Sequence, residues 1–144
     1  MTRINSAIPV RSLTDEHLLA EHREIKRLPY CLERAIASGS IHRIPVEFTL
    51  GRGHVLFFLD KMKFVFNRYQ NIHEECLLRS FFVADYSDNF SNIPPEYYND
   101  YTPTQKEMRL LRNRISERLT TSPKKSWHYY GQIVDVNEAL RHLD

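Results

Sequence analysis

Residues 54–80 read HVLFFLDKMKFVFNRYQNIHEECLLRS and are the most strongly periodic part of the chain. At about 100° per residue they form one broad apolar stripe. The stripe consists of Val55, Phe58, Leu59, Met62, Val65, Phe66, Tyr69, Cys76 and Leu77. Phe57 and Phe64 lie on its far side. A helix that is apolar on more than one face is typical of a protein core, so we predict one central helix here and assign its aromatic residues to packing.

A first helix is predicted before this segment, from Ser12 or Thr14 to Ser38, with Gly39 placed to end it. Its apolar stripe consists of Leu18, Ile25, Leu28, Leu32 and Ile36. Pro29 removes a backbone donor, so we expect a kink in the preceding turn. Within the polar sequence AEHREIKR (residues 20–27), Ala20, Arg23, Glu24 and Arg27 fall on the side opposite the apolar stripe.

A third helix is predicted from Thr104, because Glu107 follows three residues later in the pattern of a capping box. Its buried stripe consists of Met108, Leu111, Ile115 and Leu119. Residues 82–103 are rich in Asp, Asn, Ser and Pro and read as a loop. Strand patterns are weak throughout. With 144 residues, the chain is therefore predicted to be all-α, a compact single domain (1–144) of three main helices.

Positive charge is concentrated in residues 104–125, where seven basic residues stand against two acidic ones, a net charge of +5. The basic residues are Lys106, Arg109, Arg112, Arg114, Arg118, Lys124 and Lys125. Such a segment indicates a face that meets a polyanion, or else a solvated helix face. The following PKKSWHYYGQ (residues 123–132) interleaves lysines with aromatic residues, which suits either a nucleic-acid surface or packing against the helices.

Several other classes of site are not indicated. The seven histidines include no i,i+4 pair on a helix, and there is no glycine-rich phosphate loop, so we expect neither a metal nor a cofactor. Cys31 and Cys76 fall in apolar-periodic segments, which favours reduced thiols over a disulfide. Without an apolar leader or membrane-spanning run, we expect a cytoplasmic protein that does not contact membranes.

The opening MTRIN (residues 1–5) offers an unusual nucleophile. Threonine is small, so removal of Met1 is expected to expose the α-amino group of Thr2. Such an amine has a pKa of about 7.7–8.0, so a substantial fraction is neutral at pH 7. Arg3, Arg23 and Arg27 would further disfavour its charged form if the segment lies on the first helix. A neutral amine can attack a sugar carbon and form an imine.

Glu24 is the candidate partner for this amine. A carboxylate can stabilise the charge that develops on a sugar as its glycosidic bond breaks, and can move protons. The surrounding arginines favour its ionised form, which suits a base or an electrostatic stabiliser. The alternative is that AEHREIKR is only a surface charge network.

Six motifs then occur in an order and spacing that resemble the phage-type endonuclease V family. They are MTRIN, DEHLLAEHRE (15–24), LGRGHVLFFLDK (50–61), ECLLRSF (75–81), IPPEYYNDYTP (93–103) and WHYYG (127–131). Members of that family are pyrimidine-dimer DNA glycosylases with an abasic-site lyase activity. The resemblance covers residues 2–131 and leaves residues 132–144 as a C-terminal extension.

The resemblance implies a fold and a set of site residues. The N-terminal segment is expected to lie packed between the three helices. By position, Thr2 matches the amine nucleophile and Glu24 the catalytic glutamate. The remaining matches are Arg3, Arg23 and Arg27 in the substrate pocket and Arg114 and Arg118 as contacts to DNA phosphates.

We therefore expect a DNA repair enzyme that excises cyclobutane pyrimidine dimers, by glycosylase and β-elimination lyase chemistry through an imine on the N-terminal amine. Its partner would be double-stranded DNA that contains UV photoproducts, and the protein is expected to be a monomer. Two alternatives are a glycosylase or lyase for another base lesion or for abasic sites, and a helical DNA-binding protein without catalysis.

Overall fold

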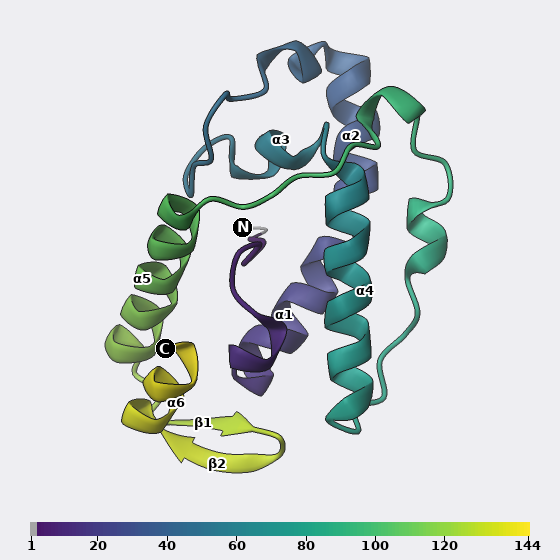
Figure 1. Cartoon of the computed structure of the whole chain (residues 1–144). Coiled ribbons are helices and arrows are strands. Elements are labelled where there is room, and N and C mark those ends of the chain that lie inside the picture. Colours follow the sequence, from purple (N-terminus) through teal and green to yellow (C-terminus); the bar gives the residue numbers. More distant parts are fainter. Residues whose placement is uncertain (1–2) are drawn as a thin grey trace.

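The computed structural model describes residues 3–144, which form six α-helices and one two-stranded sheet (Figure 1). The helices are α1 (Asp15–Ile25), α2 (Leu28–Ser38), α3 (His54–Phe58), α4 (Met62–Leu78), α5 (Gln105–Thr121) and α6 (Val136–Leu143). The strands are β1 (Ser126–Tyr129) and β2 (Gln132–Asp135). The fold is mostly helical, as predicted. In this described part of the chain, no helix is both long and apolar enough to cross a membrane.

The first predicted helix is two helices, α1 and α2. Thr14 caps α1, because its Oγ1 accepts the backbone N–H of His17 at 3.2 Å. Pro29 lies in the first turn of α2, where no donor is needed. Its ring would clash with the carbonyl of Ile25, so α1 ends at that residue and the chain breaks where we predicted a kink. Gly39, at φ 80°, ends α2 as predicted.

The second predicted helix is also interrupted, because residues 59–61 separate α3 from α4. Lys61 leaves the helical region, with φ −123° and ψ 40°, and its Nζ donates to the carbonyl of Phe57 at 2.9 Å. Phe57 and Phe58, the last two residues of α3, are 2% and 0% exposed, so both rings lie in the core.

The start of α5 is correctly predicted at Thr104, whose Oγ1 accepts the backbone N–H of Glu107 at 3.1 Å. The capping box is only half formed, however. The carboxylate of Glu107 accepts hydrogen bonds from the hydroxyls of Ser6 and Tyr101 instead. Glu107 thereby ties the start of α5 to the N-terminal segment.

The hairpin of β1 and β2 corrects the prediction that the chain is all-α. The strands pair antiparallel, with Tyr129 opposite Gln132, so the loop between them is only Tyr130 and Gly131. Both loop residues have positive φ, 51° and 78°, as the tightest hairpin turns require. Tyrosine is an unusual residue at the first position, which is why the sequence gives so little sign of this turn.

The predicted C-terminal extension contains β2 and α6. Asp135 caps α6 by accepting the backbone N–H of Glu138 at 2.8 Å. Ala139 and Leu143 are buried on the face of α6 that packs on α5 and on the hairpin. The extension therefore completes the core at this end of the molecule.

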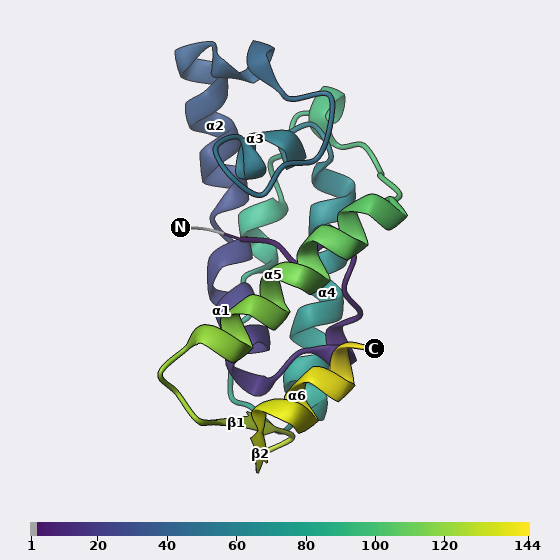
Figure 2. The ribbon, with the colours of Figure 1, turned by 90° about the vertical axis from the view of Figure 1, so that its left-hand side faces the viewer.

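The N-terminal segment, residues 3–13, runs through the interior, with α1 and α4 on one side and α5 on the other (Figures 1 and 2). Its apolar residues Ile4, Ile8 and Leu13 are at most 1% exposed. They belong to one hydrophobic cluster that also includes residues from all six described helices and both strands. A segment that is irregular apart from a short 3₁₀ helix at Val10–Ser12 therefore lies at the centre of the core and is fixed on several sides.

The two cysteines are free thiols, as predicted. Cys76 is fully buried in α4, and burial raises its pKa to about 11. Both positions therefore contribute to packing.

Candidate active site

The N-terminal segment is fixed to α1 and α4 by a buried ion pair. Arg68 of α4 donates to both carboxylate oxygens of Glu21 in α1, at 2.8 and 3.0 Å. Arg68 also donates to the carbonyl of Ile8 at 2.6 Å. The same carboxylate accepts the side-chain amide of Asn5 at 3.1 Å. Because a buried pair needs such additional hydrogen bonds, the segment and the ion pair stabilise each other.

Closer to the N-terminus, the segment is held by the first residue of α3 and by the loop before it. The backbone N–H of Ile4 donates to Nε2 of His54 at 3.0 Å. The guanidinium of Arg3 donates to the carbonyl of Leu50 at 3.3 Å. These contacts fix the direction in which the segment emerges from the core beside α1.

A pocket of about 180 Å³ opens where the segment emerges, between α1 and α5. Its lining residues are Arg3, Asn5, His17, Ala20, Glu21, Arg23, Glu24, Arg114, Ile115 and Arg118. The pocket therefore brings together five predicted site residues that lie far apart in the sequence: Arg3, Arg23, Glu24, Arg114 and Arg118. Thr2, the predicted nucleophile, lies outside the described residues.

Arg27, the remaining predicted residue, does not line the pocket. It lies at the break between α1 and α2, and its guanidinium contacts the carboxylate of Glu24 at 2.9 Å. The Arg27 side chain is 58% exposed and that of Glu24 28% exposed. An ion pair this exposed contributes about 0–1 kcal/mol to folding, so its main effect is to orient the carboxylate.

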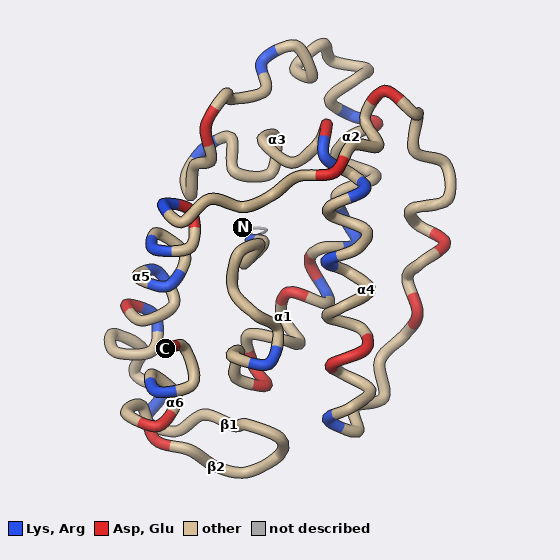
Figure 3. The backbone as a smooth tube through the Cα atoms, viewed as in Figure 1, with Lys and Arg blue, Asp and Glu red and all other residues tan. Residues whose placement is uncertain are grey.

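Cations are crowded around the pocket. Burial lowers the pKa of Arg3, and the neighbouring charges of Arg114 and Arg118 lower it further. Basic residues also follow one another along α5, as the blue segments of its tube show (Figure 3). A pocket whose rim carries this much positive charge attracts an anionic ligand such as a phosphodiester.

Two pocket residues, His17 and Asn5, were not predicted as site residues. Burial, with a smaller contribution from the charge of Arg118, lowers the pKa of His17 to about 4, so its ring is neutral at neutral pH. Asn5 is 7% exposed, and its Oδ1 has no hydrogen-bond partner among the described residues. His17 and Glu24 lie seven residues apart on one face of α1, a spacing that could have identified His17.

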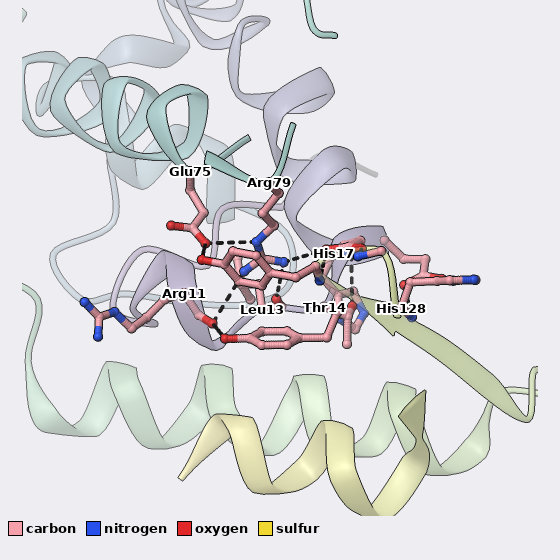
Figure 4. A network of polar contacts seen from close by, with 12 residues as sticks. Arg11, Leu13, Thr14, His17, Glu75, Arg79 and His128 are labelled. Carbon is pink, nitrogen blue, oxygen red and sulfur yellow. Dashed lines mark hydrogen bonds and ion pairs between the residues drawn. The ribbon is translucent and has the colours of Figure 1, made fainter. Parts of the chain in front are cut away.

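The aromatic hairpin is fixed by a buried arginine and so is largely a packing element (Figure 4). Arg79 donates to the carboxylates of Asp15 and Glu75, at 2.8 and 2.9 Å. Burial opposes the charge on Arg79, but its hydrogen bonds to these two carboxylates outweigh this effect and raise its pKa. The guanidinium lies 4.5 Å from the centroid of the Tyr130 ring, within the range of a cation–π contact. The Tyr130 hydroxyl donates to Glu75 at 2.6 Å.

The rest of this motif also faces the protein. Trp127 is 7% exposed and stacks on His17 with ring centroids 5.3 Å apart. Glu16 accepts hydrogen bonds from His128 and Lys124 at 2.8 and 2.9 Å. Burial opposes the charge on Glu16, but these bonds outweigh it and lower its pKa to about 2. Packing therefore explains Trp127, one of the two alternatives that the sequence left open, and His128 is held by its contact with Glu16.

A comparison with family models found one match. A model described as pyrimidine dimer DNA glycosylase matches residues 1–89, more than half of the 144-residue chain. The match includes the N-terminal segment, α1 and α4. Arg114 and Arg118 on α5 lie beyond it.

Proposed function

Because this chain belongs to the family of pyrimidine dimer DNA glycosylases, we propose that it excises cyclobutane pyrimidine dimers from duplex DNA and then cuts the strand at the exposed sugar. The observation that carries the proposal is the pocket itself. It places the carboxylate of Glu24 among four arginines, at the point where the N-terminal segment emerges.

The proposed nucleophile is the α-amino group of Thr2. Arg3, the next residue, lines the pocket together with Glu24, so the chain reaches the site within one residue of this amine. The neighbouring arginines disfavour an additional positive charge and so favour the neutral, nucleophilic amine. The amine attacks C1′ of the 5′ nucleotide of the dimer.

Glu24 stabilises the positive charge that develops on the sugar as the bond from C1′ to the base breaks. The C1′–O4′ bond opens as the amine forms a C=N double bond to C1′. The two protons that leave the amine go to O4′ and to the departing base nitrogen. Glu24 then removes a proton from C2′, and the C3′–O3′ bond breaks by β-elimination, which cuts the strand on the 3′ side.

The basic residues of α1 and α5 would hold the DNA during these steps. Arg114 and Arg118 line one wall of the pocket and Arg23 the other, so phosphates on both sides of a lesion can be contacted. At about 180 Å³ the pocket is smaller than the roughly 300–1,000 Å³ typical of small-molecule sites. It therefore suits one sugar presented by a distorted duplex, in which a lesion lowers the cost of opening.

The test is to compare the wild-type protein with Glu24→Gln on a duplex that contains one defined dimer. We expect strand cleavage to fall by on the order of 100-fold or more, because the amide keeps the shape of the side chain but can neither accept a proton nor stabilise a cation. The Kd for the same duplex should change by only about threefold. Cleavage at the wild-type rate would exclude Glu24 from the reaction, and a wild-type protein that cleaves no dimer would refute the proposed function.

A further inference from the structure

The buried histidine at the start of α3 has a defined tautomer. His54 is 2% exposed, and its Nε2 faces the backbone N–H of Ile4 at 3.0 Å. Its Nδ1 lies 2.8 Å from the carbonyl of Thr49. An N–H needs an acceptor and a carbonyl needs a donor, so the proton is on Nδ1 and Nε2 accepts from Ile4. Burial lowers the pKa of His54, which favours this neutral form.

The surroundings of His54 hold its ring in place. Phe48 and Phe58 contact it edge-on, each with ring centroids 5.4 Å away and an interplanar angle of 81°. Gly53, the preceding residue, has φ 93°, and a Cβ there would lie 3.2 Å from the ring of Pro45. This position therefore favours glycine, which accounts for part of the LGRGH motif.

His54 acts on the main chain very close to the N-terminal amine. Two residues of extended chain span at most about 7 Å, so the backbone nitrogen of Ile4 is a fixed point within this reach of the proposed nucleophile. The contacts of Arg3 with Leu50 and of Asn5 with Glu21 are made through side chains. Side chains can change rotamer and leave the backbone free to shift, whereas the bond to His54 holds the backbone itself.

We propose that His54 is a positioning residue, whose Nε2 acceptor holds the N-terminal segment so that the amine of Thr2 faces the carbon it attacks. The inference rests on the function proposed above. His54 is 2% exposed and lies outside the pocket lining, so it touches neither the sugar nor the base. Without the acceptor, the buried N–H of Ile4 must find another partner, and the segment shifts. A displacement of about 1 Å at a reacting atom can cost on the order of 100-fold in rate.

The test measures how fast borohydride traps each protein on a duplex with one pyrimidine dimer. His54→Leu removes both ring nitrogens, whereas His54→Gln keeps one acceptor and one donor. We expect trapping by His54→Leu to slow by on the order of 100-fold, with much of the rate recovered in His54→Gln. The Kd, measured for each variant in a Glu24→Gln background, should stay within about threefold of the wild-type value, because the DNA-binding arginines are unchanged.

A matched control separates positioning from general destabilisation. Tyr69→Phe removes a buried hydroxyl that accepts the backbone N–H of Tyr86 at 2.6 Å, away from the pocket lining. It should lower the melting temperature and leave the trapping rate unchanged. Trapping by His54→Leu at the wild-type rate, or a loss of trapping in Tyr69→Phe as large as in His54→Leu, would overturn the inference.

A measurement on the wild-type protein provides a second test if His54→Leu does not fold. The ¹⁵N NMR spectrum should show coupling between the amide nitrogen of Ile4 and Nε2 of His54 across the hydrogen bond at pH 7. A His54 ring protonated on Nε2 would overturn the inference. Failure of the wild-type protein to form any adduct would instead refute the proposed function, and this inference with it.

Discussion

Single residues determine how this protein responds to acid. The fold lowers the pKa of His17 and His22 to about 4, in each case mainly by burial. A histidine held neutral in the folded state takes up a proton more readily when the chain unfolds. Its contribution to stability is therefore complete above its ordinary pKa of about 6.5 and is lost as the pH falls toward the folded value.

His22 allows the clearest test of this effect. It is 3% exposed, and its Nε2 lies 3.0 Å from Nδ1 of His73 in α4. The charge of Lys26 also disfavours its protonation, while Asp85 favours it. Each unit of pKa shift corresponds to about 1.4 kcal/mol, so the free energy of unfolding should lose roughly 3 kcal/mol through His22 between pH 7.5 and pH 4.

Urea denaturation across this pH range measures the loss. In His22→Phe the free energy of unfolding should fall by about 3 kcal/mol less than in the wild type between pH 7.5 and pH 4. In His42→Gln, a change at an exposed histidine, it should fall as much as in the wild type. Identical slopes for His22→Phe and the wild type would show that His22 is not held neutral by the fold.

At the scale of secondary-structure elements, α6 is a packing element with no part in the proposed chemistry. Its buried Leu143 is 3% exposed, and the helix covers α5 and the hairpin. Truncation of a buried leucine to alanine leaves a cavity and typically costs about 2–5 kcal/mol. We expect Leu143→Ala to destabilise the protein by about this amount, measured by urea denaturation, while dimer cleavage at a temperature where it is folded stays at the wild-type rate.

The control for this helix is Asn137→Ala, at an exposed position of α6. It should change stability by less than about 0.5 kcal/mol. A cleavage defect in folded Leu143→Ala would assign α6 a role beyond packing.

Elements with strong local signals could be predicted from the sequence. Thr14, Gly39 and Thr104 mark helix ends through capping and backbone preferences that act over only a few residues. The break at residues 59–61 could not be predicted, because the apolar stripe of residues 54–80 continues across it through Leu59 and Met62. The hairpin was missed because its turn begins with Tyr130 rather than with a typical turn residue.

The candidate site was predictable to a similar extent. Arg3, Glu24 and Arg114 could be proposed from charge, the chemistry of an N-terminal amine and the resemblance to a known family. The roles of Asn5 and His54 could not be predicted, because each depends on contacts across the fold, 16 and 50 residues away in sequence.

At the scale of the whole molecule, the N-terminal segment links the core to the basic face that we propose binds DNA. It is buried beside α1, α4 and α5, and it emerges at a pocket whose walls belong to α1 and α5. In the proposed function, DNA binding and the reaction of the amine would therefore both depend on this packing of helices.

The salt dependence of DNA binding tests whether the arginines of the pocket contact DNA phosphates. Arg114→Ala should lower the slope of log affinity against log salt concentration by about one, because one phosphate contact is lost. Arg43→Ala, an exposed arginine outside the pocket lining, should leave the slope unchanged. Fluorescence anisotropy on a dimer-containing duplex measures both, and an unchanged slope for Arg114→Ala would show that this residue contacts no phosphate.

The most direct test of the proposed function is to identify which atom of the protein becomes attached to DNA. The wild-type protein is reduced with borohydride on a duplex that carries one pyrimidine dimer, and the adduct is mapped by peptide mass spectrometry. We predict a single adduct on the α-amino group of Thr2, in protein that has lost Met1. An adduct on a lysine side chain, or dimer cleavage without any trapped adduct, would contradict it.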